Sequence, residues 1–84
     1  MHYRYTTQGT CSQMIEFDIE EGKIKNVSFY GGCNGNLTGI SALVEGADAR
    51  QIADRLANIR CGFKDTSCPD QLSQAIRLAL QKEE

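Results

Sequence analysis

The chain has 84 residues, of which 40% are hydrophobic and 24% charged, so it suits one small folded domain better than a disordered segment. Its net charge of −2 offers no basic surface of the kind that binds nucleic acid or an anionic membrane. No apolar run approaches the ~18 residues of a membrane span, and no signal-peptide stretch opens the sequence, which predicts a cytoplasmic protein.

The first third of the chain has the composition and alternation of β-strands, and we expect three of them: residues 2–7, 11–20 and 23–31. The second strand alternates apolar and polar side chains along its length. The third strand breaks this alternation at Ile24, which predicts a β-bulge near Lys25-Asn26.

The rest of the chain predicts helices, because apolar side chains recur there at helical spacing. Asp48 is placed to cap the second helix, and residues 60–67 predict an irregular loop. Pro69 predicts that the last helix begins within one residue of it, with Cys68 as the cap. The three expected stripes are Leu37, Ile40, Leu43 and Val44; Ile52, Leu56 and Ile59; and Leu72, Ala75, Ile76, Ala79 and Leu80.

Strands come first and helices follow, an order typical of the α+β class. We therefore expect a single domain over residues 1–84. It should contain a small antiparallel sheet of about three strands followed by about three helices packed on one face.

The chain has four cysteines, each at a boundary between predicted elements: Cys11, Cys33, Cys61 and Cys68. Their spacing matches no zinc finger or zinc ribbon. Pairing Ile15 with Phe29 keeps the apolar side chains of the hairpin on one face. The same register sets Cys11 opposite Cys33 at the open end of the hairpin, and a bulge would slip this pairing by one residue.

The chemistry open to the four cysteines depends on whether they are thiolates. Cys33 and Cys68 each precede a predicted helix, where partial positive charge favours the thiolate that binds metal or attacks. Four converging thiolates suit zinc and also an iron–sulfur cluster. The alternatives are inert burial as small hydrophobic residues, disulfides, and a redox pair formed by Cys61 and Cys68.

Two further features argue against acid–base catalysis. The one histidine, His2, lies beside a terminus that we expect to fray, which disfavours an active site built on histidine. The acidic residues of the second strand and its turn are expected on the solvent face: Glu16, Asp18, Glu20 and Glu21. We therefore predict no catalytic residues.

Residues 66–70 read Thr-Ser-Cys-Pro-Asp, and with the glycine-rich stretch 31–36 and residues 39–41 they resemble the TSCPD-domain family, in its small stand-alone four-cysteine branch. The resemblance covers essentially the whole chain. It implies a link to cobalamin-dependent ribonucleotide reductases, at whose C-terminal end the domain occurs. The chain is too short to hold the catalytic domain of such an enzyme, so the resemblance implies an accessory domain more than an enzyme.

The order of elements is also similar, more faintly, to that of the U-type iron–sulfur scaffold proteins. Three of their cysteine positions correspond to Cys11, Cys33 and Cys68. Gln13 and Ser67 stand where the scaffold has an aspartate and a histidine, and Cys61 is an addition. The resemblance implies the scaffold's fold and site location, and the missing aspartate favours a more permanent metal than a labile cluster.

The expected function is that of a cytoplasmic metal-binding accessory or interaction domain, in which zinc is held by Cys11, Cys33, Cys61 and Cys68. The alternatives are an iron–sulfur cluster or sulfur scaffold and a thiol-redox partner that uses Cys61 and Cys68. The expected partner is a protein, such as a ribonucleotide reductase or a component of an iron–sulfur system. Neither nucleic acid nor a membrane is expected.

Overall fold

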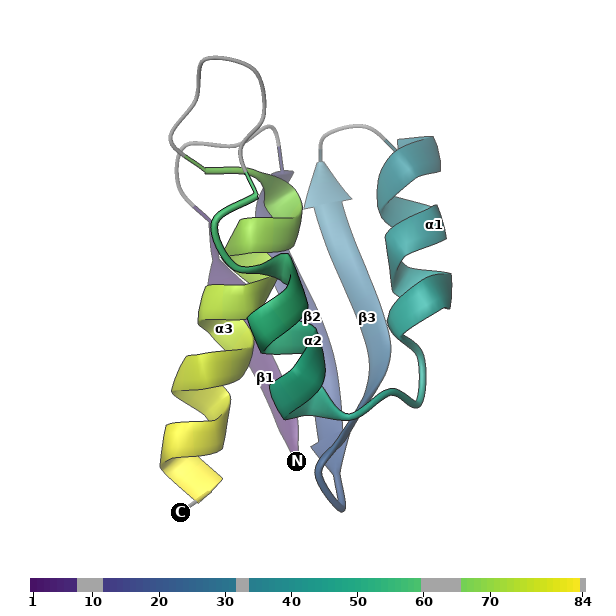
Figure 1. Cartoon of the computed structure of the whole chain (residues 1–84). Coiled ribbons are helices and arrows are strands. Elements are labelled where there is room, and N and C mark those ends of the chain that lie inside the picture. Colours follow the sequence, from purple (N-terminus) through teal and green to yellow (C-terminus); the bar gives the residue numbers. More distant parts are fainter. Residues whose placement is uncertain (8–11, 32–33, 60–65, 84) are drawn as a thin grey trace.

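The computed structural model describes residues 1–7, 12–31, 34–59 and 66–83 (Figure 1). Three strands precede three helices along the chain, which confirms the predicted α+β order. The elements are β1 (His2–Thr6), β2 (Ser12–Glu20), β3 (Lys23–Gly31), α1 (Asn34–Val44), α2 (Ala49–Leu56) and α3 (Cys68–Glu83).

The strands form one antiparallel sheet in the order β1-β2-β3. Ile15 pairs with Phe29, as predicted. The register shifts between Glu16 and Asp18, where β3 contributes one more residue than β2, and this is the predicted bulge. Asn26 lies in the bulge with φ of +56°, a left-handed conformation that asparagine adopts more readily than most residues.

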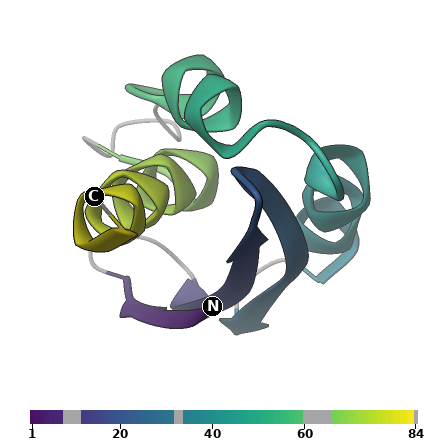
Figure 2. The same ribbon diagram turned by 90° about the horizontal axis from the view of Figure 1, so that it is seen from below.

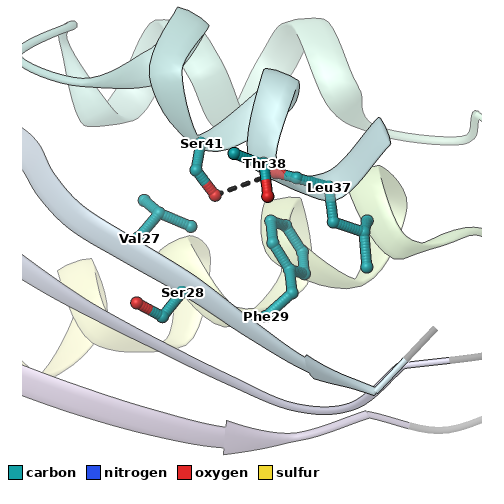
Figure 3. Close-up of a pocket in the computed structure, with 6 residues that line it drawn as sticks. All are labelled: Val27, Ser28, Phe29, Leu37, Thr38 and Ser41. Atoms are coloured by element: carbon teal, nitrogen blue, oxygen red, sulfur yellow. Dashed lines mark hydrogen bonds between the residues drawn. The ribbon is translucent and has the colours of Figure 1, made fainter. Parts of the chain in front are cut away.

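All three helices cover one face of the sheet. The buried side chains of β2 on that face are Ile15, Phe17 and Ile19, and they share a hydrophobic core with apolar residues of α3. Opposed residues point to the same face, so Phe29 shares the face of Ile15, and it points toward α1 (Figure 3). The helices α2 and α3 lie together, whereas α1 lies against β3 and stands apart from them (Figure 2).

The structure confirms most of the predicted helix signals. The carboxylate of Asp48 accepts a hydrogen bond of 3.0 Å from the backbone N–H of Gln51 and so caps α2. Gly46 follows α1 with φ of +77°, which a glycine adopts without strain. Among the described residues, no helix combines the length and apolar composition needed to cross a membrane.

Two residues of the predicted stripes are exposed instead. The chain leaves α2 at Ala57 in an extended conformation, so Ile59 lies beyond the helix and is 41% exposed. Leu43 is 83% exposed, because α1 packs mainly against β3 and turns Leu37 and Val44 inward. The sheet therefore covers less of α1 than its predicted apolar stripe indicates.

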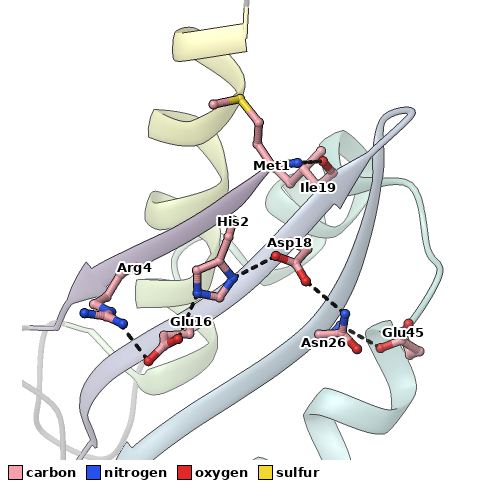
Figure 4. A network of polar contacts seen from close by, with 8 residues as sticks. All are labelled: Met1, His2, Arg4, Glu16, Asp18, Ile19, Asn26 and Glu45. Atoms are coloured by element: carbon pink, nitrogen blue, oxygen red, sulfur yellow. Dashed lines mark hydrogen bonds and ion pairs between the residues drawn. The ribbon is translucent and has the colours of Figure 1, made fainter.

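The expectation of a frayed N-terminus is wrong, because His2 is held between two carboxylates of β2 (Figure 4). Its Nδ1 lies 2.7 Å from Oδ1 of Asp18, and its Nε2 lies 2.8 Å from Oε2 of Glu16. The terminal amino group of Met1 also donates to the carbonyl of Ile19 at 2.9 Å. Strand pairing and these polar contacts together hold the start of β1 against β2.

The contacts of His2 indicate that its ring is protonated. Carboxylates only accept hydrogen bonds and a neutral imidazole has one N–H, so both contacts are satisfied together only by imidazolium. The contacts with Asp18 and then Glu16 raise the pKa of His2. The amide of Asn26 and then His2 lower the pKa of Asp18, and His2, helped by Arg4, lowers the pKa of Glu16.

The His2 contacts predict a stability difference that depends on pH. The pKa of His2 is raised on folding, so its contribution is fully present below pH ~6.5 and is lost as the pH rises through the folded-state value. We expect His2→Gln to be less stable than the wild type near pH ~5.5 and to approach it near pH ~9 in denaturant unfolding. A difference that stays constant over this range would contradict the ion-pair account.

Candidate functional site

Cys68 is among the residues that the structure describes, whereas Cys11, Cys33 and Cys61 lie outside the described ranges. Two predictions therefore fall on residues outside the described ranges. They are the pairing of Cys11 with Cys33 and the convergence of Cys61 with the other three cysteines. The last described pair of the hairpin is Ser12 with Gly31, one step out of the register that pairs Ile15 with Phe29.

The chain positions that lead to the cysteines lie at one end of the molecule. The beginnings of β2, α1 and α3 and the end of β3 all lie at the upper end in Figure 1. Cys11 directly precedes the first residue of β2, and Cys33 directly precedes the first residue of α1. The fold thus brings the neighbours of three cysteines to the end of the sheet where α3 starts.

The helix α3 begins at Cys68, within one residue of Pro69 as predicted, but its cap is Ser67 and not Cys68. The hydroxyl oxygen of Ser67 accepts a hydrogen bond of 3.1 Å from the backbone N–H of Asp70. The same hydroxyl donates to the carbonyl of Ile59 at 2.6 Å. Ser67 therefore both caps α3 and ties it to the chain that leaves α2.

The carboxylate of Asp70 makes a second tie at the same place. It accepts hydrogen bonds from the backbone N–H of Asn58 at 2.7 Å, from the hydroxyl of Thr66, and from the side-chain amide of Gln74 at 3.1 Å. Asp70 is only 6% exposed, and this burial opposes ionisation. The hydrogen bonds from Thr66, Asn58 and Gln74 outweigh burial and lower the pKa of Asp70.

We refer to the contacts of Thr66, Ser67 and Asp70 as the clasp. Their partners Asn58 and Ile59 follow α2, so the clasp fastens the exit of α2 to the first turn of α3. Further along these two helices, the buried hydroxyl of Ser73 donates to the carbonyl of Ala53 at 2.6 Å. Two helices that are consecutive in the chain are thus joined at their loop and along their contact. These contacts between α2 and α3 fix the position of Cys68 at the start of α3.

Cys68 is 7% exposed and belongs to the first turn of α3. The N–H groups of a first turn carry partial positive charge, which favours a negatively charged thiolate or a metal-bound sulfur. Within the described ranges, no three histidine, cysteine or acidic side chains gather as a metal site would require. A metal bound by Cys68 would therefore need ligands from the segments outside those ranges.

A pocket of about 300 Å³ lies between β3 and α1 (Figure 3). Its walls are apolar side chains and hydroxyls: Val27, Ser28, Phe29, Leu37, Thr38 and Ser41. The hydroxyl of Ser41 donates to the carbonyl of Leu37 at 3.0 Å. The polar groups that the side chains offer are three hydroxyls, and none of the six residues is acidic, basic or a histidine.

The structural roles of Ser67 and Asp70 were missed in the sequence. A signal was present, since serine followed three residues later by an acidic residue is a pattern found at helix starts. Pro69, which lies between them, instead predicts a cap at Cys68. The contacts of Asn58 and Ile59 had no sequence signal, because they are made across a loop.

The clasp predicts a loss of stability on substitution of Asp70. Asp70→Asn removes the charge and puts an amide N–H₂ in place of one accepting oxygen, so we expect it to lower the free energy of unfolding by about 2 kcal/mol. The matched control is Asp54→Asn, in which an exposed carboxylate 3.6 Å from Arg77 is lost and a change of less than ~0.5 kcal/mol is expected. Equal losses in both variants, measured by urea unfolding, would show that the clasp adds nothing specific.

Comparison with curated proteins and with solved structures gives no match. A family model described as the TSCPD domain matches residues 1–80, a range that includes all four cysteines and the whole clasp. The Thr-Ser-Cys-Pro-Asp motif at residues 66–70 is the segment that starts α3 and carries the clasp. By this match over nearly its full length, the chain belongs to the TSCPD domain family.

Proposed function

We propose that the chain is a metal-binding accessory domain, in which Cys11, Cys33, Cys61 and Cys68 hold one zinc ion. The observation that carries the proposal is that the chain positions next to Cys11, Cys33 and Cys68 lie at one end of the molecule.

The clasp supports the inclusion of Cys61 beside Cys68. The hydrogen bond from Ser67 to the carbonyl of Ile59 closes the base of the loop that contains Cys61. Cys61 is two residues beyond Ile59, so covalent geometry keeps their Cα atoms within about 7 Å of one another. Cys68 directly follows Ser67 on the other side of the same base.

The hairpin supports Cys11 and Cys33 in the same way. Ser12 and Gly31 pair across β2 and β3, Cys11 is adjacent to Ser12, and Cys33 is two residues beyond Gly31. Four thiolates at ~2.3 Å in a tetrahedron are a typical structural zinc site. The ion would cross-link the end of the hairpin to the start of α3. Small domains commonly need such a cross-link to be stable.

We also propose that the domain works with a protein partner. The first partner to test is a ribonucleotide reductase, the enzyme that the TSCPD resemblance implies. Iron–sulfur handling remains the competing use of the same thiolates, and metal content distinguishes the two.

The metal proposal predicts one zinc per chain in colourless protein purified without oxygen, measured by elemental analysis and absorbance. Zinc is d¹⁰ and has no visible absorption, whereas an iron–sulfur cluster is brown. Iron with acid-labile sulfide would support the scaffold function instead. Protein with no bound metal, even after supply of zinc under reducing conditions, would refute both.

Single substitutions test the ligand set. We expect Cys61→Ser, Cys33→Ser and Cys68→Ser each to lose most of the zinc and to unfold at a lower temperature. Asp54→Asn is the control, because it removes an exposed carboxylate of α2 and leaves every thiol and the clasp in place, so it should keep its zinc. If Cys61→Ser retains full metal while Cys33→Ser loses it, the site has three cysteines and an open position.

A further inference from the structure

The outer face of α1 differs from that of α2 in the side chains that it exposes. No residue of α1 is charged, whereas α2 exposes Arg50, Asp54 and Arg55 to solvent. A helix with one face in water normally carries charged side chains there. The exposed residues of α1 among those with described side chains are Thr38, Gly39, Ala42 and Leu43.

On this face the apolar side chain of Leu43 projects outward, and Gly39, which has no side chain, leaves a gap. Leu43 is 83% exposed, the highest value among the large hydrophobic side chains of the described residues. Gly39 lies one helical turn before it, and a Cβ built on Gly39 would meet no atom within 4 Å. Glycine is among the least favourable residues in a helix interior, and the packing of the described chain gives no reason for one here.

We propose that two copies of the chain pair through α1, with Leu43 of each copy seated over Gly39 of the other. In a two-fold symmetric pair the same surface of each copy meets the other. In an antiparallel crossing, Leu43 of each copy can therefore fill the space over Gly39 of the other. Because no residue of α1 is charged, like charges do not meet where the two helices would cross.

The position of α1 leaves this face open to a second copy. In both Figure 1 and Figure 2, α1 stands at the side of the molecule away from α2 and α3. The nearest charged residue in the chain is Glu45, whose carboxylate accepts a hydrogen bond of 2.8 Å from the backbone N–H of Asn26. That contact directs Glu45 toward β3 and away from the outer face of α1.

The size of the contact sets the expected strength of the pairing. An 11-residue helix is about 16 Å long, so two such helices that cross bury less than the ~1,200 Å² of a standard interface. The pair should therefore be weak and reversible, with a dissociation constant of about 10 to 100 µM. It does not depend on the metal site proposed above.

Sedimentation velocity from about 10 µM to about 1 mM tests the proposal, with a thiol reductant present to prevent disulfides between copies. The wild type should shift from monomer to dimer, and Leu43→Glu should stay monomeric throughout. Leu78→Glu is the matched control, because Leu78 is 48% exposed on α3 and should leave the dimer unchanged. A wild type that remains monomeric at about 1 mM overturns the proposal and leaves a different protein as the occupant of this face.

Gly39→Ala separates pairing from folding. Because Gly39 is helical and a Cβ there meets nothing, the substitution should raise the unfolding midpoint of the monomer, measured at a concentration well below the dissociation constant. In the dimer the same Cβ would lie under Leu43 of the other copy, so association should weaken at least about tenfold. Unchanged association in Gly39→Ala would show that the helices do not cross at this residue.

Discussion

The buried carboxylate of Asp70 is the constraint on which the candidate site depends. A carboxylate with 6% exposure stays ionised only if hydrogen bonds replace the water it has lost, and here they come from Asn58, Thr66 and Gln74. Asn58 belongs to the chain that leaves α2, so satisfying the charge requires α2 and the start of α3 to meet. The hydroxyl of Ser67 strengthens the same junction.

The family motif therefore combines two kinds of residue. Thr66, Ser67 and Asp70 hold the first turn of α3 in place, and Cys68, between them in the chain, is one of the four zinc ligands that we propose. Because the clasp consists of protein hydrogen bonds alone, it orients Cys68 whether or not a metal is present. A thiol held in advance needs less reorganisation when it binds an ion, which is the general advantage of preorganised sites.

The outer surfaces of the molecule differ in how their polar groups are used. On the sheet face that the helices leave open, His2 and Arg4 form ion pairs with Glu16 and Asp18 that hold β1 to β2. On α2, charged side chains face water, as in most amphipathic helices. The helix α1 has neither arrangement, because it carries no charged residue and exposes Leu43.

The sequence by itself determined the six elements, their order, the Ile15–Phe29 register and the bulge at Asn26, because alternation, helical spacing and turn residues are local properties. It also marked residues 66–70 as the motif of the family. Only the tertiary structure decided that Ser67 bonds to the carbonyl of Ile59 across a loop, that Leu43 is exposed and that His2 is held by two carboxylates. Each of these depends on partners distant in the chain, since His2 and Asp18 are 16 residues apart, and no local pattern specifies which distant groups folding brings together.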